Sequence, residues 1–448
     1  MSQSASVVWE VRPATGSDTQ CGGGFDPSVS SPGTDYSQQN SAQVAYTDLV
    51  IGTTTTQLTS AGNPFSSADV GNVIQITSGS GFTTGFYTIN SVSGTTATMD
   101  RAVGTASSTG GHGYLGGALA TLGGALFHSL SGIPAAGQKI WLNGTQTITA
   151  AVNIGISCSG DRISIQGYSS TRGDSGHAAL ACSTNSVDML TLAGISGFEL
   201  VQVDITNTAG TPGNGIRATA GGNSNYVTLQ NCVISGCAIG VDGNYAAPDY
   251  YQFTPIFMIE VEIKNCTSHG FQNSGISILK GCYSHNNTGD GFQVNTSQTN
   301  GISAYGCVSA NNGGVGFNFN SVASITFADV QNCDSYNNTG DGLKWTGSSV
   351  TMSLCLLNNV FYGNGGYGIN FDTTFSSANP GQVLIQRDNA FGSNTSGSRS
   401  PSNSPSGVND ISLTANPFNS PSTGDFSLNS TAGGGALLTG VGWQSSII

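Results

Sequence analysis

Charged residues are scarce in this chain: only 8% of its 448 positions are Asp, Glu, Lys or Arg. The 11 basic residues form no cluster and the net charge is −13, so we expect no nucleic-acid partner. No apolar run approaches the roughly 20 residues that a membrane-spanning helix needs, so no membrane insertion is expected. The first ten residues lack a basic region followed by an apolar stretch, so we expect no secretory signal.

Metal and cofactor motifs are missing as well. No Cys-x-x-Cys pair or Cys/His cluster has zinc-ligand spacing, and no Gly-Lys-Ser/Thr loop is present to cradle a phosphate. We therefore expect neither a metal nor a cofactor. The ten cysteines would allow disulfides, but Cys282, Cys307 and Cys333 recur at a regular spacing that favours small buried residues. Free cysteines and the absence of a signal indicate folding in a reducing cytoplasm.

Glycine and small polar residues make up much of the chain. It contains 65 Gly, and 37% of its residues are hydrophobic. Gly, Asn and β-branched residues disfavour the helix interior, whereas Thr- and Asn-rich surfaces suit exposed sheet faces. The hydrophobic residues come in short, regularly spaced runs that are sufficient to bury a long core. The composition therefore predicts an all-β protein.

One short pattern occurs four times in the second half of the chain. Its copies begin at residues 282, 307, 333 and 359, so the period is 25 or 26 residues. A repeat of this length without helix-forming composition predicts a parallel β-helix, in which equivalent residues of successive coils stack. The predicted ladder consists of Cys282, Cys307 and Cys333, of Phe292 and Phe317, and of Asn287, Asn312, Asn338 and Asn364.

Four regions follow from the distribution of turns and strand-like runs. Residues 1–45 show little periodicity and are expected to form an extended N-terminal arm that anchors the protein. Short Thr-rich runs predict a small β-barrel or sandwich over 46–112. The solenoid is expected over 113–395, with a capping helix near 118–130, because open ends of a solenoid need covers. Residues 396–448 are expected to close the last coil.

The residues also carry a resemblance. The runs 197–207 and 226–236, together with the Asn-Asn-x-Gly-x-Gly-Phe coils, resemble right-handed parallel β-helix proteins of the pectate-lyase-like superfamily. The order of arm, small β module, helix and solenoid is similar to bacteriophage tail spikes, fibres and capsid-attached appendages such as head fibres. The resemblance implies a virion component made in the host cytoplasm. It further implies a homo-oligomer, with a trimer favoured, whose N-terminal region binds other virion proteins.

Two carboxylates are candidates for catalysis. If Val261 and Ile263 face inward on a strand over Met258–Lys264, then Glu260 and Glu262 share its outer face, about 7 Å apart. Two carboxylates at that distance suit glycoside hydrolysis by an inverting route. The alternative is a solvated strand face whose charges keep the strand soluble.

The insertion before this strand contains Tyr250 and Tyr251, whose rings would form a sugar-stacking wall or would pack on the solenoid or a neighbouring subunit.

Asp290 and Asp341 occupy the same place in their copies of the repeat, where another copy has Val315. A position that tolerates Val favours a role in the turn.

Two functions from different classes remain open, because this scaffold carries lyases, hydrolases and inert proteins alike. The first is a structural or adhesive virion component that binds host surface glycans. The second is a polysaccharide depolymerase, a hydrolase or lyase that acts on host capsule or exopolysaccharide. Sparse charge and the lack of a convincing acid/base pair favour the first.

Overall fold

The structure is a computed structural model that describes ten segments of the chain: residues 6–130, 137–155, 162–219, 224–243, 253–296, 300–321, 325–346, 351–371, 381–400 and 406–439. The chain divides into two compact units. The first comprises Met1–Thr147, Ile156–Leu180 and Ser196–Val203. The second comprises Ile148–Gly155, Ala181–Ile195 and Asp204–Ile448.

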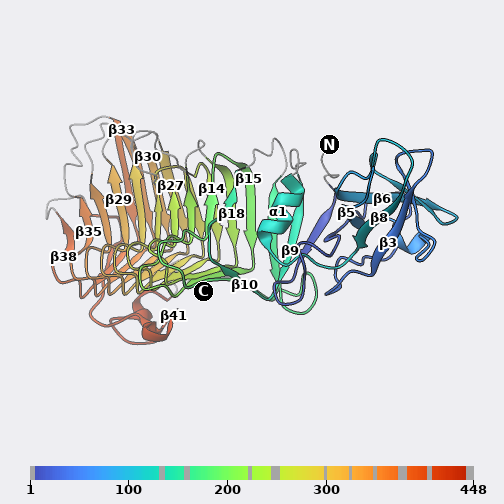
Figure 1. The fold of residues 1–448 in the computed structure, drawn as a ribbon. Coiled ribbons are helices and arrows are strands. Elements are labelled where there is room, and N and C mark those ends of the chain that lie inside the picture. The colour runs from blue at the N-terminus through green and yellow to red at the C-terminus, as the bar shows by residue number, and fades with distance from the viewer. Residues whose placement is uncertain are drawn as a thin grey trace. The chain divides into compact units, whose positions relative to one another are not determined.

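The first unit contains a closed antiparallel barrel with the strand order β3-β4-β7-β6-β5-β8 (Figure 1). Its strands are β3 (Val44–Ile51), β4 (Gln57–Thr59), β5 (Val73–Ser78), β6 (Gly85–Ser93), β7 (Thr96–Met99) and β8 (Ser108–Leu115). Alternating residues such as Leu49, Ile51 and Ile74 fill the barrel core. The small β module predicted here is therefore a barrel and not a sandwich.

The first unit also contains a mostly parallel sheet, and the N-terminal segment belongs to it. The strand order is β2 (Gly24–Phe25), β1 (Val8–Val11), β9 (Lys139–Asn143), β12 (Ile163–Tyr168) and β15 (Ser196–Val201). Val7, Trp9 and Val11 are fully buried because β1 pairs in parallel with β9. The expected extended arm thus begins with a core strand, which the Val-x-Trp-x-Val alternation encodes. Two short strands, β10 (Thr145–Ile148) and β13 (Ala178–Cys182), are neighbours in a second sheet.

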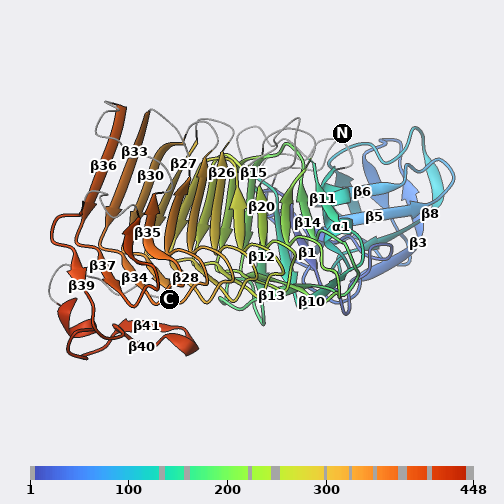
Figure 2. The same cartoon turned by 90° about the vertical axis from the view of Figure 1, so that its left-hand side faces the viewer.

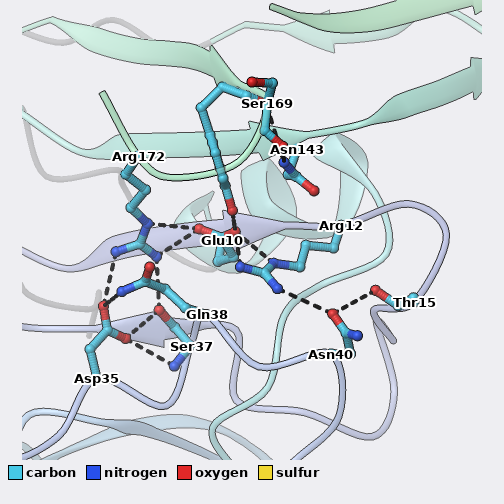
Figure 3. A network of polar contacts seen from close by, with 11 residues as sticks. Glu10, Arg12, Thr15, Asp35, Ser37, Gln38, Asn40, Asn143, Ser169 and Arg172 are labelled. Carbon is cyan, nitrogen blue, oxygen red and sulfur yellow. Dashed lines mark hydrogen bonds and ion pairs between the residues drawn. The ribbon is translucent and has the colours of Figure 1, made fainter. Parts of the chain in front are cut away.

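A buried ionic network ties the N-terminal segment to this sheet (Figure 3). The Glu10 side chain is 0% exposed and accepts bonds from Arg12 (2.9 Å), Arg172 (2.7 Å) and the Tyr168 hydroxyl. Arg172 also reaches Asp35 at 2.9 Å. Burial, followed by the bond to Glu10, raises the pKa of Tyr168 to about 12, so this hydroxyl stays a hydrogen-bond donor.

The single described α-helix is α1 (Leu122–Leu130), which has nine residues and starts four positions after the predicted start. Asp18 of the N-terminal segment accepts bonds from the backbone N–H groups of Ala120 and Thr121 at the helix start. The Thr121 hydroxyl caps the Gly124 N–H at 2.8 Å. No helix within the described segments is long and apolar enough to cross a membrane.

The second unit is a parallel β-helix whose successive coils add one strand to each of three sheets (Figure 1). Sheet A contains β18 (Asn225–Gln230), β21 (Ile256–Ile259), β24 (Ser277–Lys280), β27 (Asn300–Tyr305), β30 (Ile325–Gln331), β33 (Thr351–Leu357) and β36 (Gly381–Arg387). Sheet B contains β16 (Val203–Asn207), β19 (Val233–Ser235), β22 (Glu262–Lys264), β25 (Tyr283–His285), β28 (Val308–Ala310), β31 (Asp334–Tyr336), β34 (Val360–Tyr362), β37 (Ala390–Gly392) and β39 (Ile411–Ser412). Sheet C contains β11 (Val152–Ile154), β14 (Leu190–Leu192), β17 (Ile216–Ala218), β20 (Val241–Gly243), β23 (Phe271–Asn273), β26 (Phe292–Thr296), β29 (Phe317–Ser321), β32 (Leu343–Thr346), β35 (Tyr367–Phe371) and β38 (Gly397–Ser400). The predicted all-β parallel β-helix is confirmed.

Stacked asparagines line the corner between sheets B and C. The side-chain amide of each donates to the side-chain oxygen of the next, at 3.0 Å from Asn287 to Asn312, 2.9 Å from Asn312 to Asn338 and 3.1 Å from Asn338 to Asn364. The row continues to Asn394, which the sequence reading did not include. The residue before each has a positive φ, as in Asn286, Asn311, Asn337, Gly363 and Ser393. Asn is tolerated in this left-handed conformation, which explains the Asn-Asn pairs.

Cysteines and aromatic rings stack inside the coils. Cys282, Cys307 and Cys333 are buried and free, as are the other described cysteines apart from the partly exposed free Cys355. In later coils Asn359 and Asn389 take over the Cys position, and the Cys333 N–H bonds Asn359 at 3.0 Å. The rings of Phe292 and Phe317 stack at 5.3 Å. Size and hydrogen bonding therefore select the residues of the ladder.

The C-terminal segment lies on the outer face of sheet B. Its hairpin, β40 (Phe418–Ser420) and β41 (Asp425–Leu428), runs beside β28, β34 and β37 (Figure 2). Phe426 contacts the rings of Tyr283 and Tyr336, each at 5.8 Å. The sequence predicted that this segment closes the last coil. Its strand β39 pairs with β37 at the end of sheet B, and the hairpin that follows covers several coils, because their outward tyrosines offer it an apolar surface.

Candidate functional site

The predicted pair of carboxylates does not lie on one strand face. Val261 and Ile263 do point inward, with exposures of 1% and 0%. Glu260, however, sits between β21 and β22 with φ +53°, at the corner that Gly281 and Gly306 occupy in the next coils. The chain turns from sheet A to sheet B at this residue. The shared face expected for Glu260 and Glu262 is therefore wrong.

Glu262 is already engaged by two neighbours. Its carboxylate accepts bonds from Lys264 Nζ and His285 Nε2, each at 2.9 Å. The bond to His285, followed by Lys264, lowers the pKa of Glu262 to about 2. A carboxylate with this pKa stays ionised at neutral pH, so Glu262 is unsuited to donate a proton as a general acid.

The Glu262 contacts predict a defined pH dependence of stability. Folding lowers the pKa of Glu262 from its ordinary value of 4.5. Glu262 therefore contributes fully to stability at pH values above 4.5, and this contribution is lost as the pH falls toward 2. We expect Glu262→Gln to lower the free energy of unfolding by about 1 kcal/mol at pH 7, a value reduced for solvent screening. Urea unfolding of both proteins at pH 7 and pH 2 measures this, and the difference should vanish at pH 2. An equal difference at both pH values would contradict the ion-pair account.

The predicted aromatic wall cannot be placed. Tyr250 and Tyr251 lie outside the described residues, which resume at Phe253. Phe253 and Phe257 differ in environment: Phe253 is fully buried, whereas Phe257 is partly exposed on the outer face of β21. The sugar-stacking role of Tyr250 and Tyr251 therefore remains a prediction.

Sheet C has a row of polar side chains on the side away from the core, and three of them, Thr191, Asp242 and Gln293, are themselves buried. The strand register places one hydrogen-bonding side chain of each successive coil in line: Thr191, Arg217, Asp242, Gln272, Gln293, Asn318, Lys344 and Asn370. Their strand neighbours, such as Phe271, Phe292 and Phe317, point into the core. Adjacent members are about 4.8 Å apart, the spacing between hydrogen-bonded strands. The row therefore forms a linear track that crosses the strands.

Polar residues two positions before the strands of sheet C support this row. Asp290 accepts bonds from the Val315 N–H (2.7 Å) and from Asn318 Nδ2 (2.7 Å), both in the next coil. Asp341 repeats the arrangement with the Tyr367 N–H (2.6 Å) and Asn370 Nδ2 (2.8 Å). The two aspartates thus cap a backbone group of the following coil and hold one amide of the polar row. This matches the turn role predicted for them.

The same arrangement builds a charged cluster at the first coils of sheet C. Asp188 caps the Asn214 N–H at 2.8 Å and binds Arg217 Nη1 at 2.9 Å. Asn214 in turn donates to Asp242 at 2.9 Å, and Arg217 Nε lies 3.5 Å from Asp242. One guanidinium therefore lies between two carboxylates. This cluster can donate and accept hydrogen bonds toward a ligand, because about a third of the Arg217 side chain (32%) is exposed.

The sequence alone did not predict the polar row. Its members differ in type from coil to coil, so no repeated letter marks them. The signal that could have found it is the position one residue after the first core-facing Phe, Leu, Ile or Val of each strand from β14 to β35, which is polar in every case. Within the described segments, no three His, Cys, Asp or Glu side chains are grouped so that they could hold a metal ion.

No family model matches the sequence, and no curated protein matches it significantly. Pectate lyase Pel9A is similar in structure, with 16% identity and a TM-score of 0.46 over 70% of this chain and 80% of that one. The A-module of the mannuronan C-5 epimerase AlgE6 from Azotobacter vinelandii has 14% identity and a TM-score of 0.33, over 64% of this chain and 91% of that one. The tailspike protein gp49 from Pseudomonas phage LKA1 has 16% identity and a TM-score of 0.32, over 83% and 61%. This chain is a parallel β-helix protein, as its own strand pairing shows.

Proposed function

We propose that this protein is a structural component of a phage virion appendage that binds host surface glycans along the polar row of sheet C. The observation that carries the proposal is the row itself, with one hydrogen-bonding side chain per coil at a spacing of about 4.8 Å. Glycans present hydroxyls at intervals along a chain, and amide, guanidinium and ammonium groups recognise hydroxyls by hydrogen bonds. The virion setting and a trimeric assembly follow from the resemblance described above.

The arrangement of the acidic residues favours binding over catalysis. Asp188, Asp290 and Asp341 each accept a backbone N–H and a side-chain donor from the next coil. These bonds occupy the carboxylate oxygens, whereas a catalytic carboxylate must face the bond that it acts on. Depolymerisation is the alternative function, although Glu260 and Glu262, the carboxylates expected for it, do not share a strand face and Glu262 is ionised at neutral pH.

The proposal is tested with a panel of linear capsular polysaccharides and exopolysaccharides immobilised for binding measurements. We expect one or more of them to bind, and we expect the double substitution Gln272→Ala/Asn318→Ala to weaken that binding about tenfold or more, because two direct hydrogen bonds are lost. Thr288→Ala, an exposed corner residue away from the row, serves as the matched control and should bind as the native protein does. Binding that is unchanged in the double variant would refute the site.

The two candidate functions separate in a parallel assay of the same mixtures. Reducing ends report hydrolysis, and unsaturated products report elimination. We expect neither to accumulate. Turnover that disappears in Glu260→Gln or Glu262→Gln would overturn the purely structural proposal in favour of a depolymerase.

A further inference from the structure

The polar row of sheet C lies among more negative than positive charges. On the strands β14 to β35 of this sheet, and in the described turns that lead into them, carboxylates outnumber cations by four to two: Asp188, Asp242, Asp290 and Asp341 against Arg217 and Lys344. Arg399 on the last strand, β38, forms an ion pair with Asp410. Every Lys and Arg of the chain falls within the described segments, so the loops outside them add no positive charge.

The single cation of the first coils is opposed at close range. Arg217 Nη1 lies 2.9 Å from Asp188, and Arg217 Nε lies 3.5 Å from Asp242. The two carboxylates more than offset the charge of this guanidinium. The cluster can therefore form hydrogen bonds to a ligand without offering it a net positive charge.

The carboxylates of the later coils are held by uncharged donors. Asp290 accepts a bond from Gln293 Nε2 at 3.0 Å, in addition to the backbone N–H and the amide of the row described above, and Asp341 has the same two kinds of donor. His269 lies 3.6 Å from Asp290, but burial, only partly offset by Asp290, lowers the pKa of His269, so this imidazole is neutral at pH 7. Asp290 and Asp341 are 7% and 9% exposed, so salt and water screen their charges weakly.

Uncharged side chains dominate the surface above these carboxylates. Beside the row, a second file of outward side chains is in register on β26, β29 and β32: Asn295, Asn320 and Thr346. It lies about 7 Å from the row along each strand. Amides and hydroxyls both donate and accept hydrogen bonds, as sugar hydroxyls do, whereas a carboxylate, sulfate or phosphate offers acceptors alone.

We propose that the glycan bound by sheet C is uncharged, a chain of neutral hexoses or N-acetylated amino sugars, and that this face excludes glycans with uronic acids, sulfates or phosphates. This inference rests on the proposed function, because it names the class of glycan that the polar row binds. The amides of the row supply the attraction. Asp290 and Asp341 supply the repulsion, since like charges brought together at an interface suppress the wrong partner.

The test compares glycans that differ in charge alone. Each acidic polysaccharide of the panel is measured beside its carboxyl-reduced form, in which the uronic acids have become neutral hexoses on the same backbone. We expect the reduced form to bind about tenfold or more tightly than its parent at low salt. Raising the salt should strengthen binding of the acidic parent, because its repulsion is screened, and should leave binding of the neutral form unchanged.

A pair of charge-neutralising variants locates the repulsion. Asp290→Asn/Asp341→Asn removes two negative charges beneath the row and should reduce the preference for the neutral form to about threefold or less. Asp425→Asn makes the same kind of change at an exposed carboxylate of the C-terminal hairpin and should leave the preference as in the native protein. The salt dependence of the native protein does not require that either variant folds.

The outcomes separate this inference from the proposed function. An acidic glycan that binds as tightly as its reduced form, with binding lost in Gln272→Ala/Asn318→Ala, would overturn the inference and leave the proposed function standing. Binding of no glycan in either form would overturn the proposed function and the inference with it. A preference that is unchanged in Asp290→Asn/Asp341→Asn would overturn the role given to these two carboxylates.

Discussion

Replacing Glu10 with Ala is expected to destabilise the first unit by about 3 kcal/mol or more, because it removes one partner from a buried ionic network. Arg12 and Arg172 would lose their shared carboxylate while still packed against β1, and the Tyr168 hydroxyl would lose its acceptor. The Glu10 side chain is 0% exposed, so water does not easily replace it. The N-terminal strand should then detach from β9.

Amide hydrogen exchange measures this change locally. The amides of β1 and β9 should lose protection by about 100-fold or more, the rate equivalent of about 3 kcal/mol. Amides of the late coils, such as those of β28 and β31, serve as the internal control and should exchange as in the native protein. Glu10→Gln keeps the shape and one acceptor and should produce a smaller loss. Unchanged protection of β1 in Glu10→Ala would show that the network does not hold the N-terminal segment.

Replacing Asn338 with Ala is expected to cost about 4 kcal/mol, because the side chain serves several buried groups at once. Its oxygen accepts from the Asn312 N–H (3.1 Å) and Asn312 Nδ2 (2.9 Å). Its amide donates to the Ser309 carbonyl (3.0 Å) and to Asn364 (3.1 Å). Asn338 itself is 1% exposed, so the groups left behind have no access to solvent.

Urea unfolding followed by circular dichroism measures the loss as a lower transition midpoint. The adjacent residue is the matched control: Asn337 is at the corner with φ +50°, where Gly363 stands in the next coil. Asn337→Gly should change stability by less than about 1 kcal/mol, since Gly adopts this conformation freely. If both substitutions had the same small effect on the free energy of unfolding, the asparagine ladder would not stabilise the solenoid.

The ladder and the candidate binding row have different tolerances to change. Ladder positions hold Asn or Cys in consecutive coils because each side chain must fit and bond in a dry interior. The outer row of sheet C changes from Arg217 to Gln272 to Lys344 without disturbing the coils, because those side chains meet solvent. Residues of this face can therefore change from coil to coil at little cost in stability, which suits the proposed glycan-binding role.

Much of the fold could be predicted from the sequence where coils are regular. Between residues 282 and 369 the copies recur every 25 or 26 residues, so equivalent residues stack and the parallel β-helix follows. Elsewhere the coil length varies: the ladder steps are 21 residues from Cys266 to Asn287 and 30 from Asn364 to Asn394. Variable insertions break the sequence period but not the stack, because strand pairing depends on the coil ends alone.

By itself, the sequence determined that the protein is all-β and parallel, that Asn, Cys and Phe stack inside, and that its small N-terminal module is separate in composition. Only the tertiary structure decided which residues share a face. It put Glu260 at a corner, Val7–Val11 in the core sheet, the C-terminal hairpin on sheet B and one polar residue per coil in line on sheet C. The physical reason is that core positions obey a local alternation that any single strand displays. A surface is assembled across coils, from residues more than 20 positions apart, and no local pattern records it.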